Sequence, residues 1–409
     1  MRINFLNSFY HSPLADVNMI SVDEAKKIVK DNVYVMPSVN VALKDAAGFV
    51  LAEDVYSAID FPPFNQSNVD GYAIAFNDAD KRLTINGLSA AGNSVDKGLQ
   101  RGQAMRIFTG APIPANADTV VMQEKVVVQN GSLIIEDNKL QQGVNFRAKG
   151  KDITKGSLAL HKNDLLTAGG VGFLTSLGLT NVRVYKKPSI SIIITGNELQ
   201  GAGKPLQYGE VYEANSYMLK AALQQLQFDD VEVYYADDNL ERLTAILNSA
   251  LENADVVLLC GGISVGDYDF VLQAAANCGI KKLFHKVKQR PGKPLYFGKK
   301  ETKIVFGLPG NPSSVLTCFY EYVAEALAMI TMRKNFTRIT YSTLQNDYTK
   351  IAGLTFFLKG LIEADNVIAL DAQESYRLSS YAKANCLIKL DEERTAYKSG
   401  EKVEVHILF

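Results

Sequence analysis

The sequence contains no tryptophan, and only four of its 409 residues are cysteines. The cysteines stand at positions 260, 278, 318 and 386 without CxxC spacing, and the four histidines are equally dispersed. This pattern argues against a zinc site of the usual Cys/His kind. It is typical of a protein from a reducing compartment, so we expect a cytoplasmic location.

Charge of one sign and long apolar runs are also scarce. The net charge is −1, so no global basic field favours a nucleic-acid partner. The N-terminal stretch "MRINFLNSFYHSPL" lacks the apolar core of a signal peptide, and no apolar run approaches the roughly 20 residues of a membrane span. With 47% apolar and 21% charged residues, the composition predicts a globular multidomain protein without nucleic-acid or membrane partners.

Residues 188–335 alternate between strand and helix patterns. The apolar runs and the helical patterns that follow them span residues 191–195 and 215–227, 231–235 and 239–253, 256–260 and 268–278, and 303–307 and 312–330. Helical segments of this length between strands are typical of βαβ units. We therefore expect an α/β nucleotide-fold domain with a doubly wound parallel sheet.

Three other regions complete the predicted organisation. Ser21 and Glu24 have capping-box spacing at the start of a helix over 21–31, which we expect to pack with a helix and strand in 164–187. Between these segments, short β-rich runs separated by Gly, Pro and Asn predict an inserted β module, and alternating runs near the C-terminus predict a β-barrel. The predicted domains span 19–58 with 152–187 (discontinuous N-terminal α/β domain), 59–151 (β module), 188–335 (nucleotide-fold domain) and 336–409 (barrel).

Loops that carry glycine, carboxylate or hydroxyl groups follow all four strands of the predicted sheet. They read "TGNEL" (195–199), "ADD" (236–238), "CGGISVGDYDF" (260–270) and "GLPGNPSS" (307–314). Because ligands bind outside the carboxyl ends of strands in an open parallel sheet, the loops predict a ligand site at one edge. Each loop alone also has a structural explanation: glycine suits tight turns, Asp267 or Asp269 can cap a helix, and Asn311-Pro312 can start one.

The chemistry of these loops suits phosphate and a metal ion. Backbone N–H groups at helix N-termini bind phosphate oxygens, and Glu198, Asp237 and Asp269 offer the oxygen ligands that Mg²⁺ prefers. A cation-rich stretch follows, although an exposed hairpin would explain it equally well. Its four cations are Lys286, Lys288, Arg290 and Lys293. The sequence thus predicts an anionic, phosphate-bearing ligand together with Mg²⁺.

Three further turn-rich motifs lie in and beside the β module. They are "DFPPFNQSNVDGYA" (60–73), "RIFTGAPIP" (106–114) and "GVNFRAKGKDI" (143–153), and composition alone indicates surface loops. Together with "TGNEL", "CGGISVGDYD", "QRPGKPLYFG" and "GLPGNPSS", they occur in the order and approximate spacing of one known family. The sequence resembles the molybdopterin molybdenumtransferases, the bacterial MoeA proteins similar to the E domains of gephyrin and plant Cnx1, over about residues 19–409.

The resemblance implies an enzyme that inserts molybdate into adenylylated molybdopterin with Mg²⁺ and releases AMP and molybdenum cofactor. It implies a homodimer with the active site between subunits, and an upstream adenylyltransferase as a partner. The residues that it implicates as catalytic are Asp70, Thr109, Asp152, Glu198, Asp237 and Asp269, the last three also as metal ligands. Those that it implicates in substrate binding are Arg147, Lys286, Arg290, Lys293, Pro309 and Pro312, with Ser264 and Ser313 as weaker candidates.

The sequence departs from the family pattern at three positions. Asn65 and Asn197 stand where Asp is common, so neither is a strong metal-ligand candidate. Arg290 stands where Lys is usual; it keeps the charge and adds a planar fork suited to oxyanions.

The residues available indicate positioning and charge neutralisation rather than covalent catalysis. No histidine lies in the loops named above, and Cys260 ends a buried strand. We expect Mg²⁺ to polarise the phosphoanhydride and the cations of 286–293 to bind molybdate and phosphate oxygens. Two alternatives remain: the related adenylyltransferase, which typically carries "GGTG" where this sequence has "GGIS", and a non-catalytic pterin-binding scaffold.

Overall fold

The structure, a computed structural model, describes residues 19–93, 98–263 and 270–408. Contacts divide the chain into two compact units. Met1–Ser38 and Tyr185–Phe409 form the first, which we call the sheet-and-barrel unit, and Val39–Val184 form the second, which we call the insert unit.

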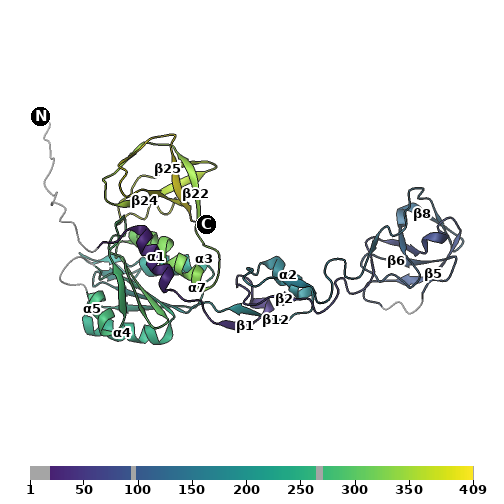
Figure 1. Ribbon diagram of the computed structural model, residues 1–409, viewed down its shortest axis with the longest axis horizontal. Helices are drawn as coiled ribbons and strands as arrows, with labels where there is room; N and C mark the ends of the chain where they lie inside the picture. The colour runs from purple at the N-terminus through teal and green to yellow at the C-terminus, as the bar shows by residue number, and fades with distance from the viewer. Residues whose placement is uncertain (1–18, 94–97, 264–269, 409) are drawn as a thin grey trace. The chain divides into compact units, whose positions relative to one another are not determined.

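A six-stranded sheet forms the centre of the sheet-and-barrel unit (Figure 1). Its order is β16-β13-β17-β21-β20-β18, in which the first four strands are parallel and the last two antiparallel. The strands are β13 (Ile190–Thr195), β16 (Val231–Ala236), β17 (Val256–Cys260), β18 (Lys281–His285), β20 (Tyr296–Lys300) and β21 (Lys303–Leu308). The predicted doubly wound parallel sheet is confirmed, and two further strands, β20 and β18, extend it on one side with antiparallel pairings that were not predicted.

Helices cover both faces of this sheet. Along β13, Ile192 and Ile194 belong to one apolar core and Ile193 to the other, as the alternation of a strand requires. The first core includes α1, α3, α6 and α7, and the second includes α4 and α5 (Figure 1). The helices are α1 (Val22–Asn32), α3 (Asn215–Gln225), α4 (Leu240–Asn253), α5 (Phe270–Asn277), α6 (Pro312–Cys318) and α7 (Ala324–Ile330), with a π-helical turn η4 (Phe319–Val323) joining the last two.

Helix α1 begins as its capping pattern predicts. The Ser21 hydroxyl accepts a hydrogen bond from Glu24 N at 3.2 Å. The buried Ala25 and Val29 lie in the first core beside the sheet and α7. The expectation that this helix packs with residues 164–187 is therefore wrong, because its apolar face is buried in the sheet-and-barrel unit.

The C-terminal strands close into the predicted β-barrel. β24 pairs with β25, β25 with β22, β22 with β28, β28 with β26, and β26 again with β24. A short strand from the cation-rich loop, β19, joins β24 in parallel. These strands are β19 (Gln289–Arg290), β22 (Arg338–Leu344), β24 (Thr355–Glu363), β25 (Asn366–Ala369), β26 (Cys386–Leu390) and β28 (Lys402–Ile407).

The insert unit contains a second six-stranded sheet, in the order β7-β4-β6-β5-β9-β8. Its strands are β4 (Gly71–Ile74), β5 (Leu83–Ser89), β6 (Gln103–Ile107), β7 (Thr119–Met122), β8 (Val126–Gln129) and β9 (Ser132–Ile135). Apolar residues of 43–55 and 153–184, including helix α2 (Ala168–Ser176), share a separate core. The four domain boundaries drawn from the sequence stay a prediction.

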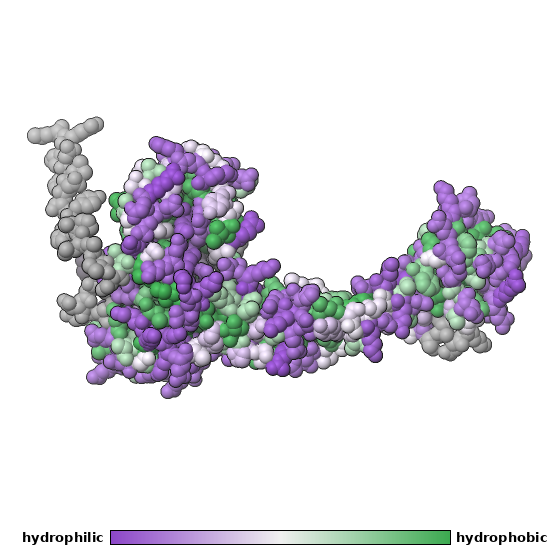
Figure 2. Space-filling model, viewed as in Figure 1, coloured by the Kyte–Doolittle hydropathy of each residue, from purple (hydrophilic) through white to green (hydrophobic). Residues whose placement is uncertain are grey.

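The distribution of hydrophilic residues and cysteines follows the division between surface and core. Hydrophilic residues cover much of the face of each unit shown in Figure 2. All four cysteines are buried and free of disulfides, and burial raises the pKa of the Cys260 and Cys318 thiols. In the part of the chain that the structure describes, no helix combines the length and apolarity needed to cross a membrane.

Candidate functional site

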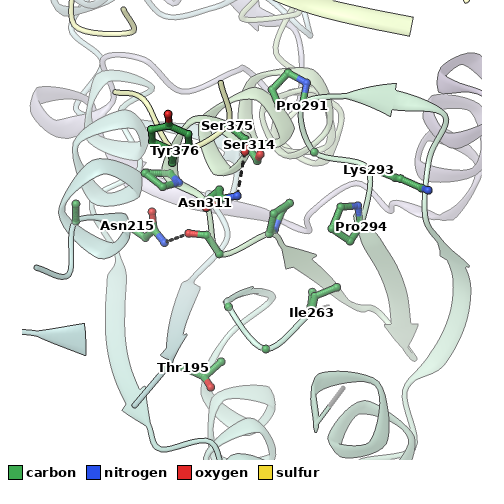
Figure 3. A pocket seen from close by; sticks show the side chains of 18 of the residues that line it. Thr195, Asn215, Ile263, Pro291, Lys293, Pro294, Asn311, Ser314, Ser375 and Tyr376 are labelled. Carbon is green, nitrogen blue, oxygen red and sulfur yellow. Dashed lines mark hydrogen bonds between the residues drawn. The ribbon is translucent and has the colours of Figure 1, made fainter. Parts of the chain in front are cut away.

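A cavity of about 1330 Å³ opens at the carboxyl edge of the α/β sheet (Figure 3). The loops that follow β13, β16, β17 and β21 all contribute to its lining, as their positions in sequence predict. Residues 289–294 of the cation-rich loop and residues 373–376 of the barrel also line it, as do residues around the start of α3, Phe270 and Leu354. The cavity therefore lies between the nucleotide-fold sheet and the barrel.

The loops after β13 and β17 approach each other closely at this edge. Gly261 has φ +92°, and a Cβ there would lie 2.2 Å from the Thr195 carbonyl oxygen. Only glycine fits such a position. Since β16 and β17 lie on opposite sides of β13, this contact occurs where the strand order reverses, which is the usual ligand position in open α/β sheets.

Carboxylates form one part of the lining. The Thr195 hydroxyl donates to Asp238 Oδ1 at 2.5 Å, and Asn197 Oδ1 accepts a hydrogen bond from Asp238 N at 3.2 Å. Glu198 also lines the cavity. Asp237, the residue named from the sequence, is not part of the lining; its carboxylate forms an ion pair with the exposed Arg242.

These carboxylates offer the hard oxygen ligands that Mg²⁺ prefers, so the donor set fits the ion in chemistry. Glu198 and Asp238 are the two described carboxylates of the sheet edge that line the cavity. Asp269, the third ligand expected from the sequence, and Ser264 lie outside the described residues. Among the described residues, no group of three or more His, Cys, Asp or Glu side chains could hold a metal ion.

Cations form another part of the lining, on a loop held from within. Arg290 and Lys293 both line the cavity, whereas Lys286 does not. Buried Gln289 supports the loop by donating from Nε2 to the carbonyl oxygens of Pro291 at 3.1 Å and Gly292 at 3.2 Å. The loop therefore presents its cations from a fixed backbone.

The loop after β21 connects the cavity to the barrel. Asn311 Nδ2 donates to Ser375 Oγ at 3.0 Å (Figure 3). In addition, Ser313 N donates to the Ser375 carbonyl at 3.1 Å. Pro309 and Pro312 line the cavity as expected, but Ser313 does not: it is fully buried, and its hydroxyl makes no hydrogen bond with any described residue.

Among the lining residues that were not predicted are Asp238 and residues 373–376 of the barrel. The barrel segment has no motif of its own, because it reaches the cavity through tertiary contacts. For Asp238, the "ADD" loop was the available signal, but the sequence could not show which of the two aspartates faces the ligand.

The remaining candidate residues lie in the insert unit. Asp70 Oδ1 accepts hydrogen bonds from both the N–H and the hydroxyl of Thr109, each at 2.8 Å. These bonds, the backbone one first, lower the pKa of Asp70. Strand β10 (Phe146–Arg147) pairs with β3 (Gln66–Ser67), and Asp152 N donates to the Phe61 carbonyl at 3.0 Å. The motifs at 60–73, 106–114 and 143–153 thus lie together.

Three features define the class of this protein: a doubly wound sheet with a ligand cavity at its carboxyl edge, a closed barrel beside that sheet, and a separate β-rich unit. Together they indicate a multidomain α/β ligand-binding protein. Three family models cover almost all of this chain: the MoeA N-terminal region (domain I and II) matches residues 20–178, a probable molybdopterin binding domain matches 191–329, and the MoeA C-terminal region (domain IV) matches 341–408.

Proteins with similar sequences match this chain along almost its whole length. The molybdopterin molybdenumtransferase of Haemophilus influenzae is 32% identical over 397 residues, which cover 95% of this chain and 98% of that protein. The protein of the same name from Staphylococcus epidermidis is 33% identical over 399 residues, covering 94% and 95%. A crystal structure of a molybdopterin biosynthesis MoeA protein from Pyrococcus horikoshii OT3 has a TM-score of 0.78 at 30% identity and covers 95% of this chain and all of that one. The chain belongs to the molybdopterin molybdenumtransferase (MoeA) family.

Proposed function

We propose that this protein is a transferase of molybdenum cofactor biosynthesis that inserts molybdate into adenylylated molybdopterin and releases AMP. The observation that carries the proposal is the cavity at the sheet edge, where Glu198 and Asp238 face the same space as Arg290 and Lys293. A substrate with phosphate groups, an oxyanion co-substrate and a divalent cation together match these charges.

The cations would hold the oxyanions. Arg290 offers a planar fork to molybdate or phosphate oxygens, and its guanidinium lies 5.4 Å from the centre of the Phe356 ring, which restricts its orientation. Lys293 adds a point charge from the same supported loop. Both residues would stabilise negative charge that develops on the departing AMP phosphate.

The carboxylates would hold Mg²⁺. We propose Glu198 and Asp269 as ligands, with Asp238 in preference to Asp237, because Asp238 lines the cavity while Asp237 pairs with Arg242. When bound, the ion supplies positive charge that polarises the phosphoanhydride. The thiolates that take up molybdenum belong to the substrate, so no protein nucleophile is needed, in keeping with the burial of all four cysteines.

On the family resemblance, we also propose a cytoplasmic homodimer in which Asp70, Thr109, Arg147 and Asp152 of one subunit complete the cavity of the other. Lys286, Ser264 and Ser313 stay weaker substrate-binding candidates. A partnership with the adenylyltransferase that supplies the substrate has the same support.

The test is AMP release by purified protein supplied with adenylylated molybdopterin, molybdate and Mg²⁺. We expect release that depends on both molybdate and the metal. Binding of the pterin without AMP release would favour the scaffold alternative, and adenylylation of free molybdopterin from ATP would favour the adenylyltransferase alternative.

A further inference from the structure

A buried lysine stands behind the barrel wall of the cavity. Lys359, on β24, has 1% of its surface exposed. Its Nζ donates to the carbonyl oxygens of Ala372 at 2.7 Å, Glu374 at 3.3 Å and Arg377 at 3.2 Å. An ammonium group has three N–H donors, so these three bonds use its full capacity.

All three acceptors belong to one short segment, residues 372–377, which forms neither helix nor strand. Carbonyl groups in such a segment have no partners from a helix or a sheet, so their donors come from elsewhere in the chain. The backbone of Lys359 contributes as well: its N–H donates to Gln373 Oε1 at 3.0 Å, and its carbonyl accepts from Gln373 Nε2 at 2.9 Å. One residue of β24 thus holds the segment through both its side chain and its backbone.

The same segment supplies the barrel side of the cavity. Residues 373–376 line it, and Ser375 bonds to the loop after β21 through its hydroxyl and its carbonyl. The segment is therefore held from two sides, by Lys359 within the barrel and by Asn311 and Ser313 across the cavity edge.

We propose that Lys359 is a positioning residue for the substrate cavity, whose ammonium group fixes segment 372–377 in the place where it contacts substrate. The charged groups nearest to it are Glu374 and Arg377, and the ring of Tyr381 lies 5.7 Å from its Nζ. Burial lowers the pKa of Lys359 to about 8, partly offset by Glu374 and reinforced by Arg377, so protonated lysine still predominates at pH 7. The kinetic part of the inference rests on the proposed function, and the structural part does not.

Lys359→Met tests the structural part, because it keeps an unbranched chain but removes all three donors. Hydrogen exchange in segment 372–377 should accelerate about 10-fold, because the carbonyl groups of Glu374 and Arg377 lose the lysine donor and the segment opens more often, although the Ala372 carbonyl keeps the Ser380 hydroxyl as a donor. Lys350→Met is the matched control: the Nζ of Lys350 also donates to three carbonyls, those of Ile351, Leu354 and Glu392, and none of these acceptors belongs to segment 372–377. Exchange in segment 372–377 should be unchanged in that variant.

The kinetic measurements distinguish a positioning role of Lys359 in substrate binding from a general effect on protein stability. Lys359→Met should raise the KM for the pterin substrate about 10-fold and change kcat less, since the segment binds rather than reacts. Lys359→Arg, which keeps charge and donors, should restore exchange protection and KM to within about threefold of wild type.

Normal exchange in segment 372–377 of a folded Lys359→Met protein would overturn the inference, as would an equal effect of Lys350→Met. If Lys359→Met does not fold, Lys359→Arg decides: a folded arginine variant must keep the segment protected, and loss of protection there would refute the proposal. Absence of AMP release by the wild-type protein would instead refute the proposed function and leave the exchange result standing.

Discussion

The carboxylate of Asp70 accepts two hydrogen bonds at one oxygen, from the backbone N–H and the hydroxyl of Thr109. Thr109→Val removes the hydroxyl donor and leaves the backbone donor. We expect the pKa of Asp70 to rise toward its ordinary value, because one of the bonds that stabilise the charged form is lost. Titration of the carboxyl group by NMR measures this, with Thr84→Val on the exposed side of β5 as the control. An unmoved pKa would show that the backbone bond suffices.

Two adjacent aspartates should differ in their effect on catalysis. Asp238→Asn should lower the rate of AMP release by about 100-fold, because it removes charge from the cavity lining. Asp237→Asn, which disrupts only an exposed pair with Arg242, should leave the rate within about threefold of wild type. Steady-state rates over a range of Mg²⁺ concentrations make the comparison. The reverse order of effects would restore Asp237 as the metal-ligand candidate.

Lys293→Ala should raise the molybdate concentration needed for half-maximal rate by about 10-fold, since a hydrogen bond to a charged group contributes roughly 1.5–3 kcal/mol. Lys282→Ala, on an exposed position of β18, should not change it. Initial rates at varied molybdate measure both. Identical molybdate dependence in the two variants would remove Lys293 from the oxyanion site.

The interior also contains a cluster of titratable groups that should make the free energy of unfolding depend on pH. Glu321 lies between Lys26 Nζ at 2.8 Å and His406 Nδ1 at 2.7 Å. Burial alone would raise the pKa of Glu321, but Lys26 and His406 outweigh it and lower the pKa to about 2. For His406, burial alone would lower the pKa, but Glu321, together with a hydrogen bond to Glu404, outweighs it and raises the pKa above 6.5.

The pKa shifts of Glu321 and His406 have opposite effects on the stability of the folded protein as the pH rises. The contribution of Glu321 is present above about pH 4.5 and is lost as the pH falls toward 2, whereas that of His406 is present below pH 6.5 and is lost as the pH rises through its raised pKa. We expect the cluster to stabilise most between these limits. Denaturant unfolding across pH should show Glu321→Gln destabilised by about 3 kcal/mol with a flatter profile. The exposed Glu363→Gln is the control, and a parallel profile in both variants would contradict the account.

The proposed dimeric site predicts complementation. Asp70→Ala and Glu198→Ala proteins should each be inactive alone. After mixing and reassembly, about half of the dimers should be hybrids, each with one site that carries both defects and one intact site, so activity should return to roughly a quarter of wild type. Inactive, verified hybrids would place both residues in one site of a single chain.

The sheet was predictable because strands buried on both faces read as continuous apolar runs, as "SIIIT" and "VVLLC" do. Strands β18 and β20 were not predicted, because lysines and a glycine leave only short runs of apolar residues in them. Helix α1 was predicted as a helix from its cap and period, but no local signal states which core a helix will join.

The site was predictable where it follows strand ends and unpredictable where it depends on distant contacts. Glu198 lies in a loop whose place follows from the order of the strands, whereas Arg290 and Lys293 were candidates because of their charge and the family resemblance. Ser375 reaches the cavity through Asn311, 64 residues earlier in the chain, which no spacing rule reveals. Asp237 and Asp238 differ by one position, and only the folded backbone decides which carboxylate turns inward.

The buried cysteines have a practical consequence. All four belong to the sheet-and-barrel unit, and Val39–Val184 contain none. A thiol reagent can therefore modify the native protein only when that unit opens, because burial holds the thiols away from solvent and unionised. The rate of modification measures the opening of one unit without interference from the other, so the chain carries its own stability probe without an introduced label.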